Sequence, residues 1–153
     1  MNLRNMNKIL FYKIKEPYGE FSNFSPHPIT VNGKIYSTTE SYFQAQKFAG
    51  TEHEEAVRLC KGPRAAAEMG RRRDLPLRAD WEQVKEEIMR EALWAKIEQY
   101  PRVKDLLLST GDNELVEHTA NDSYWADGGD GSGKNRLGVI WMKIRADLQS
   151  TDG

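Results

Sequence analysis

The chain has 153 residues, a length that fits one domain able to bury about two thirds of the surface that its unfolded form exposes. Its formal net charge of −1 argues against a general nucleic-acid binder, because such domains are usually strongly basic. No stretch approaches the roughly 20 apolar residues of a membrane span, and the N-terminus lacks the apolar core of a signal peptide.

The cysteine and histidine content bears on compartment and metal binding. Cys60 is the single cysteine, so an internal disulfide is excluded and a reducing compartment is indicated. A zinc site built on Cys60 would need His27, His53 and His118 as ligands, and these histidines show no metal-type spacing. We therefore expect a cytoplasmic protein without a structural metal.

The N-terminal part of the chain has the pattern of strands. One strand is predicted over 9–14, and a hairpin over 29–36 is split by Asn32-Gly33, the pair typical of a type I′ turn because both central residues need positive φ. The segment 18–26 between them, Tyr-Gly-Glu-Phe-Ser-Asn-Phe-Ser-Pro, has neither helical nor strand periodicity and is predicted to be a loop.

From Ser37 onward the pattern changes to helices. Later helix starts are indicated by cap residues, or by proline at a first helical position, at Thr51, Pro63, Asp80 and Pro101. The helix predicted over 80–100 is the longest. Its apolar stripe consists of Trp81, Val84, Ile88, Met89, Ala92, Leu93, Ala95 and Ile97.

The last part of the chain predicts a short strand over 114–119, a loop over 121–136 and a final helix over 137–148. That helix keeps its apolar residues on one side: Leu137, Ile140, Trp141, Ile144 and Leu148. The predicted fold class is therefore α+β, a mostly helical single domain over 1–153 with a small, mainly antiparallel N-terminal sheet.

The first helix places a carboxylate, Glu40, inside its first turn, and this admits two interpretations. In a capping box, Ser37 would accept from the Glu40 amide while the Glu40 side chain reached back to the Ser37 amide. Alternatively, Glu40 is a catalytic carboxylate held at a fixed angle. It shares a helix face with Phe43, Gln44 and Lys47, although Lys47 lies roughly 10 Å further along the axis, too far for direct pairing.

The longest helix carries a cation beside its apolar stripe. Lys85 lies one turn after Trp81, and it either extends to water from the edge of the stripe or turns inward to meet a carboxylate or a substrate anion. Trp81 itself is either a core residue or the flat wall of a base-binding pocket.

Two further stretches are candidates for anion binding. The run Arg71-Arg72-Arg73, with Arg64 and Arg78 nearby, is either a solvated face or an anion site. The loop 124–135 has four glycines in six residues, which would let backbone amides approach a ligand ahead of a helix N-terminus. Its spacing matches neither a P-loop nor a calcium-binding loop.

At these residues the chain resembles the YbiA-like N-glycosidases of the NADAR superfamily, in family order over roughly 10–148. The matching stretches are Phe21-Ser-Asn-Phe24, residues 37–47, Pro76-Leu-Arg-x-x-Trp81 with Lys85 and Met89, Trp125-Ala-Asp-Gly-Gly129 and Gly133-Lys-Asn-Arg-Leu-Gly138. One departure is Ala126, where the family usually has glycine.

The resemblance implies a YbiA-like fold and hydrolysis of a bond between ribose C1 and a heterocycle nitrogen. The implied substrates are ribosylamino-pyrimidine phosphates of the riboflavin pathway, with release of ribose 5-phosphate and no cofactor. A carboxylate near C1 would stabilise the oxocarbenium-like transition state, and a second group would serve the leaving base. The implied catalytic residues are Glu40, Lys85 and Asp127. The implied substrate-binding residues are Asn23, Phe24, Trp81, Trp125, Gly128 and Asn135.

Two other functions stay open on the sequence. Other NADAR members resemble ADP-ribosyl hydrolases, including ones that act on guanine in DNA, and for such an enzyme nucleic acid would be a partner. The near-neutral charge is less suited to that role. A nucleotide sensor without catalysis is the second alternative, and it predicts that Glu40→Gln removes no turnover. For the N-glycosidase the expected partner is a phosphoribosyl compound, and for the ADP-ribosyl hydrolase it is an ADP-ribosyl compound. No membrane is expected as a partner.

Overall fold

The computed structural model describes residues 7–152, and these residues fall into two compact units. The terminal unit combines residues 7–22 and 101–152, and the central unit is residues 23–100. The predicted α+β class with mostly helical content is confirmed by the element order. The prediction of a single domain concerns both units together and stays a prediction.

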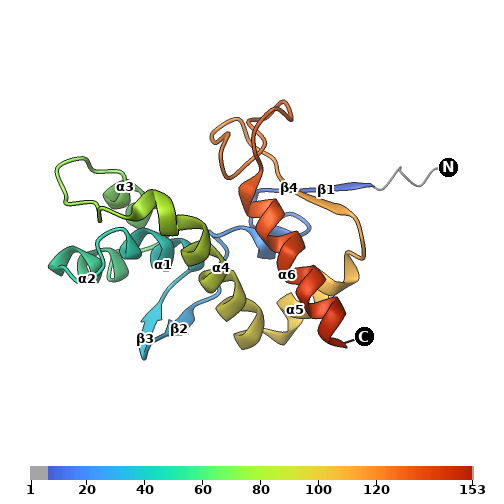
Figure 1. Ribbon diagram of the computed structural model, residues 1–153, viewed down its shortest axis with the longest axis horizontal. Coiled ribbons are helices and arrows are strands. Elements are labelled where there is room, and N and C mark those ends of the chain that lie inside the picture. The colour runs from blue at the N-terminus through green and yellow to red at the C-terminus, as the bar shows by residue number, and fades with distance from the viewer. Residues whose placement is uncertain (1–6, 153) are drawn as a thin grey trace. The chain divides into compact units, whose positions relative to one another are not determined.

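The central unit consists of a hairpin and four helices. They are β2 (Ile29–Val31), β3 (Lys34–Tyr36), α1 (Thr39–Gln46), α2 (Glu52–Arg58), α3 (Pro63–Gly70) and α4 (Trp81–Gln99). Helix α1 lies against α2, α3 and α4 (Figure 1). In the antiparallel hairpin, Ile29 is opposite Tyr36. Asn32 and Gly33 have φ values of 53° and 80°, so the predicted type I′ turn chemistry is confirmed.

Helix α1 begins one residue later than the sequence suggests. Its N-cap is Thr38, whose extended backbone lets the side-chain oxygen accept from the Ser41 amide at 3.0 Å. The Glu40 amide instead donates to the carbonyl of Asn23 at 3.2 Å. Of the two interpretations of Glu40, the capping box with Ser37 is therefore excluded, because Thr38 occupies the cap position and the Ser37 hydroxyl pairs with that of Ser41.

The other predicted helix starts differ from one another in how the first turn is capped. Thr51 caps α2 through the His53 amide, as predicted. Pro63 occupies the first turn of α3, also as predicted. Asp80 is the N-cap of α4 but makes no side-chain cap bond, since both carboxylate oxygens bind the Arg78 guanidinium at 2.6 and 3.1 Å. Asp80 thus pairs with Arg78, two residues earlier in the chain, in place of capping the helix with its side chain.

The terminal unit consists of two strands and three helices. They are β1 (Lys8–Phe11), the short 3₁₀ helix η1 (Gly19–Phe21), α5 (Pro101–Ser109), β4 (Glu114–Glu117) and α6 (Arg136–Asp152). Strand β1 pairs with β4 in parallel, with Ile9 opposite Leu115. The prediction of a mainly antiparallel sheet thus holds for the β2–β3 hairpin and not for the β1–β4 pair. Strand β1 takes a partner far along the chain, so no tight turn imposes an antiparallel direction.

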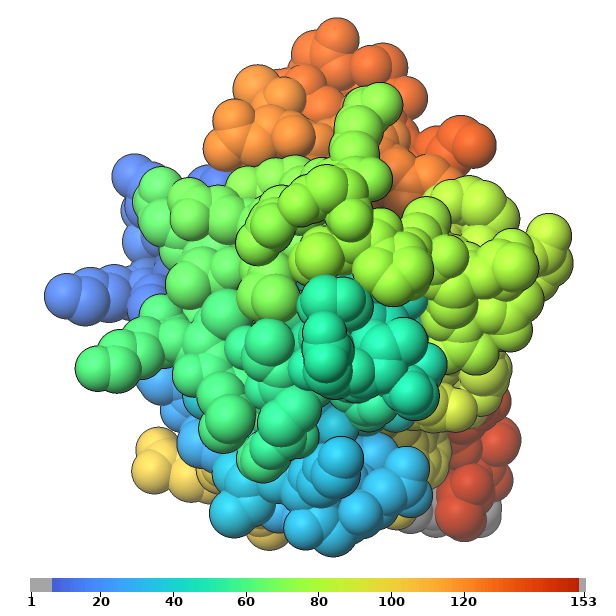
Figure 2. All heavy atoms as spheres, turned by 90° about the vertical axis from the view of Figure 1, so that its left-hand side faces the viewer, coloured from blue at the N-terminus to red at the C-terminus, as the bar shows by residue number. Residues whose placement is uncertain are grey.

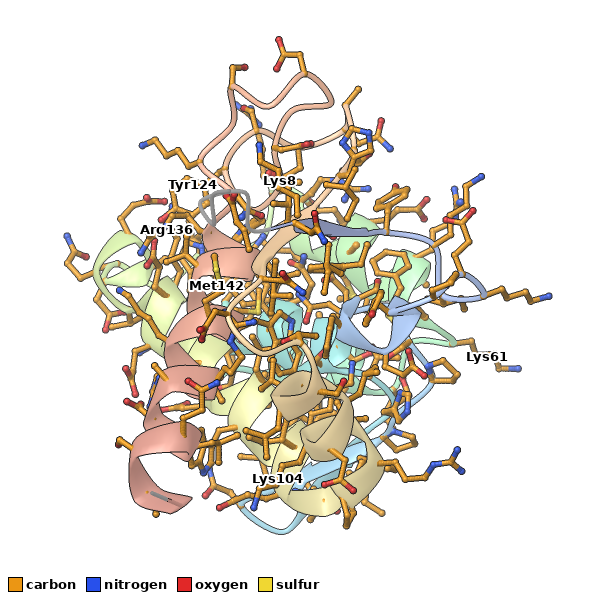
Figure 3. All side chains as sticks on the ribbon, turned by 90° about the vertical axis from the view of Figure 1, so that its right-hand side faces the viewer. Lys8, Lys61, Lys104, Tyr124, Arg136 and Met142 are labelled. Carbon is orange, nitrogen blue, oxygen red and sulfur yellow. The ribbon has the colours of Figure 1, made fainter. Side chains whose placement is uncertain are left out.

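Helix α6 supplies the core of the terminal unit and packs on β4. All five predicted stripe residues are buried, which confirms the apolar face. The indole N–H of Trp141 donates to the carbonyl of Phe21 at 3.0 Å, and the Phe21 ring lies against Trp141. Figure 3 shows where the preceding loop enters α6, with Tyr124 near Arg136, whose amide donates to the Tyr124 carbonyl at 2.9 Å. No helix within residues 7–152 has the length and apolar content needed to cross a membrane.

Candidate active site

Glu40 is half-buried in the first turn of α1, and its carboxylate has a fixed partner one turn along the helix. The side-chain amide of Gln44 donates to Glu40 Oε2 at 2.7 Å. The two residues are four apart, so their side chains lie on one face. The carboxylate is therefore aimed by Gln44, while Thr38 caps the helix.

Asn23 holds the backbone in front of α1 against the first turn of the helix. Its side-chain oxygen accepts from the Thr39 hydroxyl at 2.8 Å, and its side-chain nitrogen donates to the sulfur of Met89 at 3.4 Å. Its carbonyl accepts from the Glu40 amide. These contacts make buried Asn23 a positioning residue for Glu40, while its predicted contact with a base stays a prediction.

Trp81 begins α4 and forms the wall beside the shared face of α1. Its ring is buried against Phe43, with ring centroids 5.0 Å apart, and Lys47 Nζ lies 5.8 Å from the centre of its ring. Phe24, also in the central unit, is 39% exposed, so a ligand ring can reach it. Trp81 is thus a core residue that also carries a cation on its face.

Lys85 combines features of both interpretations of its position. The Lys85 side chain is only 17% exposed, so its stem is largely covered. Its Nζ binds Glu82 Oε1 at 2.7 Å, and the Glu82 side chain is 73% exposed. The ammonium thus lies where a covered surface meets water. Central-unit candidates Glu40, Trp81 and Lys85 therefore come from α1 and the first turns of α4, two helices that pack together.

In the terminal unit, Asp127 is buried and paired with a histidine that the spacing of the sequence did not single out. His118 Nδ1 lies 2.7 Å from Asp127 Oδ2, while Oδ1 accepts from the amides of Thr119 and Gly129 at 3.1 and 2.8 Å. Burial raises the pKa of Asp127, but the hydrogen bonds from His118, Gly129 and Thr119 outweigh it and leave the pKa below its usual value. Asp127 is therefore a carboxylate at neutral pH.

The Gly-rich loop is closed on itself. The amides of Gly128, Gly133 and Lys134 donate to loop carbonyls, and those of Arg136 and Leu137 at the start of α6 donate to the carbonyls of Tyr124 and Trp125. These five amides are among those that the sequence suggested for an anion, and each of the five already has an acceptor. The Trp125 ring, half-buried, stands edge-on to Tyr124.

Asn135 fastens the end of this loop to β4. It is buried, and its side chain accepts from the Glu117 amide and donates to the Leu115 carbonyl, both at 2.9 Å. Its φ of 52° is a left-handed conformation that asparagine tolerates better than most residues. The contacts of Gly128 and Asn135 shape the loop, and their predicted contact with substrate stays a prediction.

Comparison with known proteins assigns the chain to a family. Residues 10–149 match the NADAR domain. The chain belongs to the NADAR family. A relative named N-glycosidase YbiA, from Escherichia coli (strain K12), is 53% identical over 140 residues, covering 92% of this chain and 88% of that protein. N-glycosidase Npun_R5314 from Nostoc punctiforme is 41% identical over 145 residues, covering 93% of each.

Two further comparisons extend the family relationship. Riboflavin biosynthesis protein PYRR, chloroplastic, from Zea mays is 39% identical over 160 residues, covering 95% of this chain but 26% of that longer protein. The NMR structure of E. coli YbiA matches with a TM-score of 0.89 and 49% identity, covering 99% of this chain and 90% of that chain. The predicted NADAR membership and YbiA-like fold are confirmed, as is the prediction of an enzyme that hydrolyses N-glycosyl bonds.

The one departure from the NADAR pattern has a simple structural account. Ala126 is fully buried, and it is not among the described residues with positive φ, so alanine fits its backbone conformation without strain. Its carbonyl accepts from the Asn135 amide at 3.0 Å.

Within residues 7–152, no three His, Cys, Asp or Glu side chains come together as metal ligands would.

Proposed function

We propose that this N-glycosidase cleaves the ribose C1–N bond of ribosylamino-pyrimidine phosphates of the riboflavin pathway and releases ribose 5-phosphate. The names of its relatives support this, because two are N-glycosidases and one is a riboflavin biosynthesis protein. The observation that carries the proposal is the Glu40 carboxylate, held by Gln44 at 2.7 Å on a helix packed against the one that carries Trp81 and Lys85.

In the proposed reaction, the C1–N bond breaks with its electron pair going to the nitrogen of the base. Positive charge builds up on C1 and the ring oxygen, and the carboxylate of Glu40 stabilises it. A water oxygen then bonds to C1, and Glu40 accepts one proton of that water. Because Gln44 fixes one carboxylate oxygen, the other keeps a defined direction toward the sugar.

The leaving base needs a proton as its nitrogen takes up the electron pair, and we assign this donor to Lys85. An ammonium can supply the proton, whereas Asp127 is held ionised by its hydrogen-bond donors and has no proton to give at neutral pH. The role proposed for Asp127 is to orient His118 and fix the loop of the terminal unit. Each catalytic step then has its own group.

The heterocycle needs flat apolar surface, and Phe24 and Trp81 of the central unit are the proposed partners. Phe24 is exposed enough to stack on a base, and Trp81 offers an electron-rich ring that already carries Lys47. In the terminal unit, Trp125, Gly128 and Asn135 are proposed to present the loop conformation that substrate binding requires.

The substrate assignment is tested by one side-by-side assay. The purified protein is incubated with a ribosylamino-pyrimidine phosphate and, separately, with ADP-ribosylated guanine, and kcat/KM is measured for each. We expect a kcat/KM at least about 100-fold higher for the pyrimidine compound, equivalent to about 2.7 kcal/mol of transition-state discrimination. The opposite preference would identify an ADP-ribosyl hydrolase. Binding without turnover of either compound would identify a sensor.

A further inference from the structure

Lys47, at the end of α1, is held in a defined place, although no step of the proposed reaction uses it. Its Nζ donates to the carbonyl of Gly70 at 3.2 Å and lies over the ring of Trp81. The backbone around it is also fixed, since Arg78 donates to the carbonyls of Gln46 and Lys47 at 3.3 and 3.0 Å. A half-buried ammonium is thus anchored at the junction of α1, the end of α3 and the start of α4.

This position gathers positive charge. Burial lowers the pKa of Lys47, Glu40 raises it, and the charges of Arg71 and Lys85 lower it further. Arg72 and Arg78 of the predicted arginine group form ion pairs with neighbouring aspartates. The side chain of Arg71, by contrast, makes no ion pair within residues 7–152. Cations gathered in this way attract an anion.

A polar atom without a partner lies at the same place. Within residues 7–152, Gln44 Oε1 is the one buried side-chain polar atom without a hydrogen-bond partner. It faces Gly70 so closely that a Cβ there would lie 1.9 Å from it. Because Gln44 is buried and its nitrogen is committed to Glu40, its oxygen requires a donor such as a hydroxyl group.

Figure 2 views the side of the central unit on which α2 (Glu52–Arg58), in teal, lies beside the green residues of α3 and the loop that follows it. The cluster of Lys47, Arg71 and Gln44 combines two cations with a buried carbonyl acceptor, Gln44 Oε1. A sugar phosphate has the matching groups, since its phosphate binds ammonium and guanidinium groups and its hydroxyls donate.

We propose that Lys47 and Arg71 form the subsite for the substrate's phosphate, and that Gln44 Oε1 accepts a hydrogen bond from a sugar hydroxyl. This inference rests on the proposed function and names the part of the central unit that holds the ribose 5-phosphate portion. It also favours one of the two predicted anion sites, because the amides of Gly128, Gly133 and Lys134 in the Gly-rich loop already donate to carbonyls of that loop.

The test measures binding of ribose 5-phosphate, ribose and inorganic phosphate to the whole protein by titration calorimetry. In Lys47→Gln we expect the affinity for ribose 5-phosphate to fall by about 10- to 100-fold, the effect of losing a charge-assisted hydrogen bond, while weak binding of ribose is unchanged. Lys47→Arg keeps the charge and should recover part of the loss. Lys61→Gln, an exposed lysine outside the cluster, is the matched control and should bind like wild type.

The outcomes separate the subsite from the reaction. Equal affinity of wild type and Lys47→Gln for ribose 5-phosphate would overturn the subsite. Lys47-dependent binding in a protein that cleaves no pyrimidine ribosylamine phosphate would support the subsite and refute the proposed function. In a third outcome, wild type and Lys47→Gln both cleave the substrate and prefer its phosphorylated form over the dephosphorylated form to the same degree. That result would support the proposed function and refute the subsite.

Discussion

Glu40→Gln is expected to lower kcat by about 10³-fold while the protein stays folded, because the substitution keeps the shape of the side chain and removes its charge. The glutamine oxygen still accepts from Gln44, so the local packing is retained. Without the negative charge, the positive C1 of the transition state loses its stabilising partner. The measurement is the initial rate of ribose 5-phosphate release at saturating substrate, accompanied by a thermal unfolding curve.

Two companion variants make the Glu40 result specific. Gln44→Leu removes both the group that aims the carboxylate and the proposed acceptor for a sugar hydroxyl, and we expect a smaller loss of about 10- to 100-fold, since the charge of Glu40 remains. Glu68→Gln changes an exposed carboxylate on α3 and should leave kcat unchanged. Full activity of Glu40→Gln would remove Glu40 from the mechanism.

Asn135→Ala is expected to lower the free energy of unfolding by about 2 to 4 kcal/mol, the largest stability effect anticipated for a single substitution in the terminal unit. The change deletes two side-chain hydrogen bonds and leaves the Glu117 amide and the Leu115 carbonyl unpaired. It also places alanine at a φ of 52°, where asparagine is better tolerated. Urea denaturation measures the effect.

Controls in the same unit separate these contributions. Asn135→Gly removes the strain of a positive φ at this position but does not restore the two lost hydrogen bonds, so it should also destabilise the protein strongly. Asn121→Ala removes one exposed hydrogen bond to the hydroxyl of Tyr12 and should cost less than about 0.5 kcal/mol. An Asn135→Ala variant as stable as Asn121→Ala would show that the fastening of the loop to β4 is not important for stability.

The parts of the fold predicted correctly depend on local chemistry. Asn32-Gly33 needs only its own backbone preference to form the turn, and Pro63 and Pro101 begin helices because proline fits a first helical position. The stripe of α6 follows from periodicity along a single helix. Such features are readable because no distant residue is required to produce them.

The features that were missed or wrongly predicted depend on partners far along the chain. Strand β1 pairs in parallel with β4, which no local pattern specifies. Lys96 on α4 is fully buried and donates to the Ser25 hydroxyl at 2.6 Å, although a lysine in a helix is usually exposed. Ser37 loses the cap position to Thr38, its neighbour of the same chemical type.

The candidate site shows the same division. Gln44 and Lys47 could be placed on the face of Glu40 from helical spacing, and the Gln44 bond confirms that face. The role of Asn23 could not be read, since its partners Thr39 and Met89 come from two different helices. The pairing of His118 with Asp127 requires a loop to return to the end of β4, and nothing in the spacing of the two residues signals it.

The central claim is that this NADAR enzyme hydrolyses the C1–N bond of a ribosylamino-pyrimidine phosphate, and NMR spectroscopy of the reaction mixture tests it most directly. The C1 proton and phosphorus signals are followed as wild-type protein acts on the substrate. We predict that the N-glycoside C1 signal decays while ribose 5-phosphate and the free base appear in equal amounts, and that Glu40→Gln abolishes this change on the same timescale. An unchanged C1 signal with wild-type protein, or release of phosphate without loss of the C1–N bond, would contradict the claim.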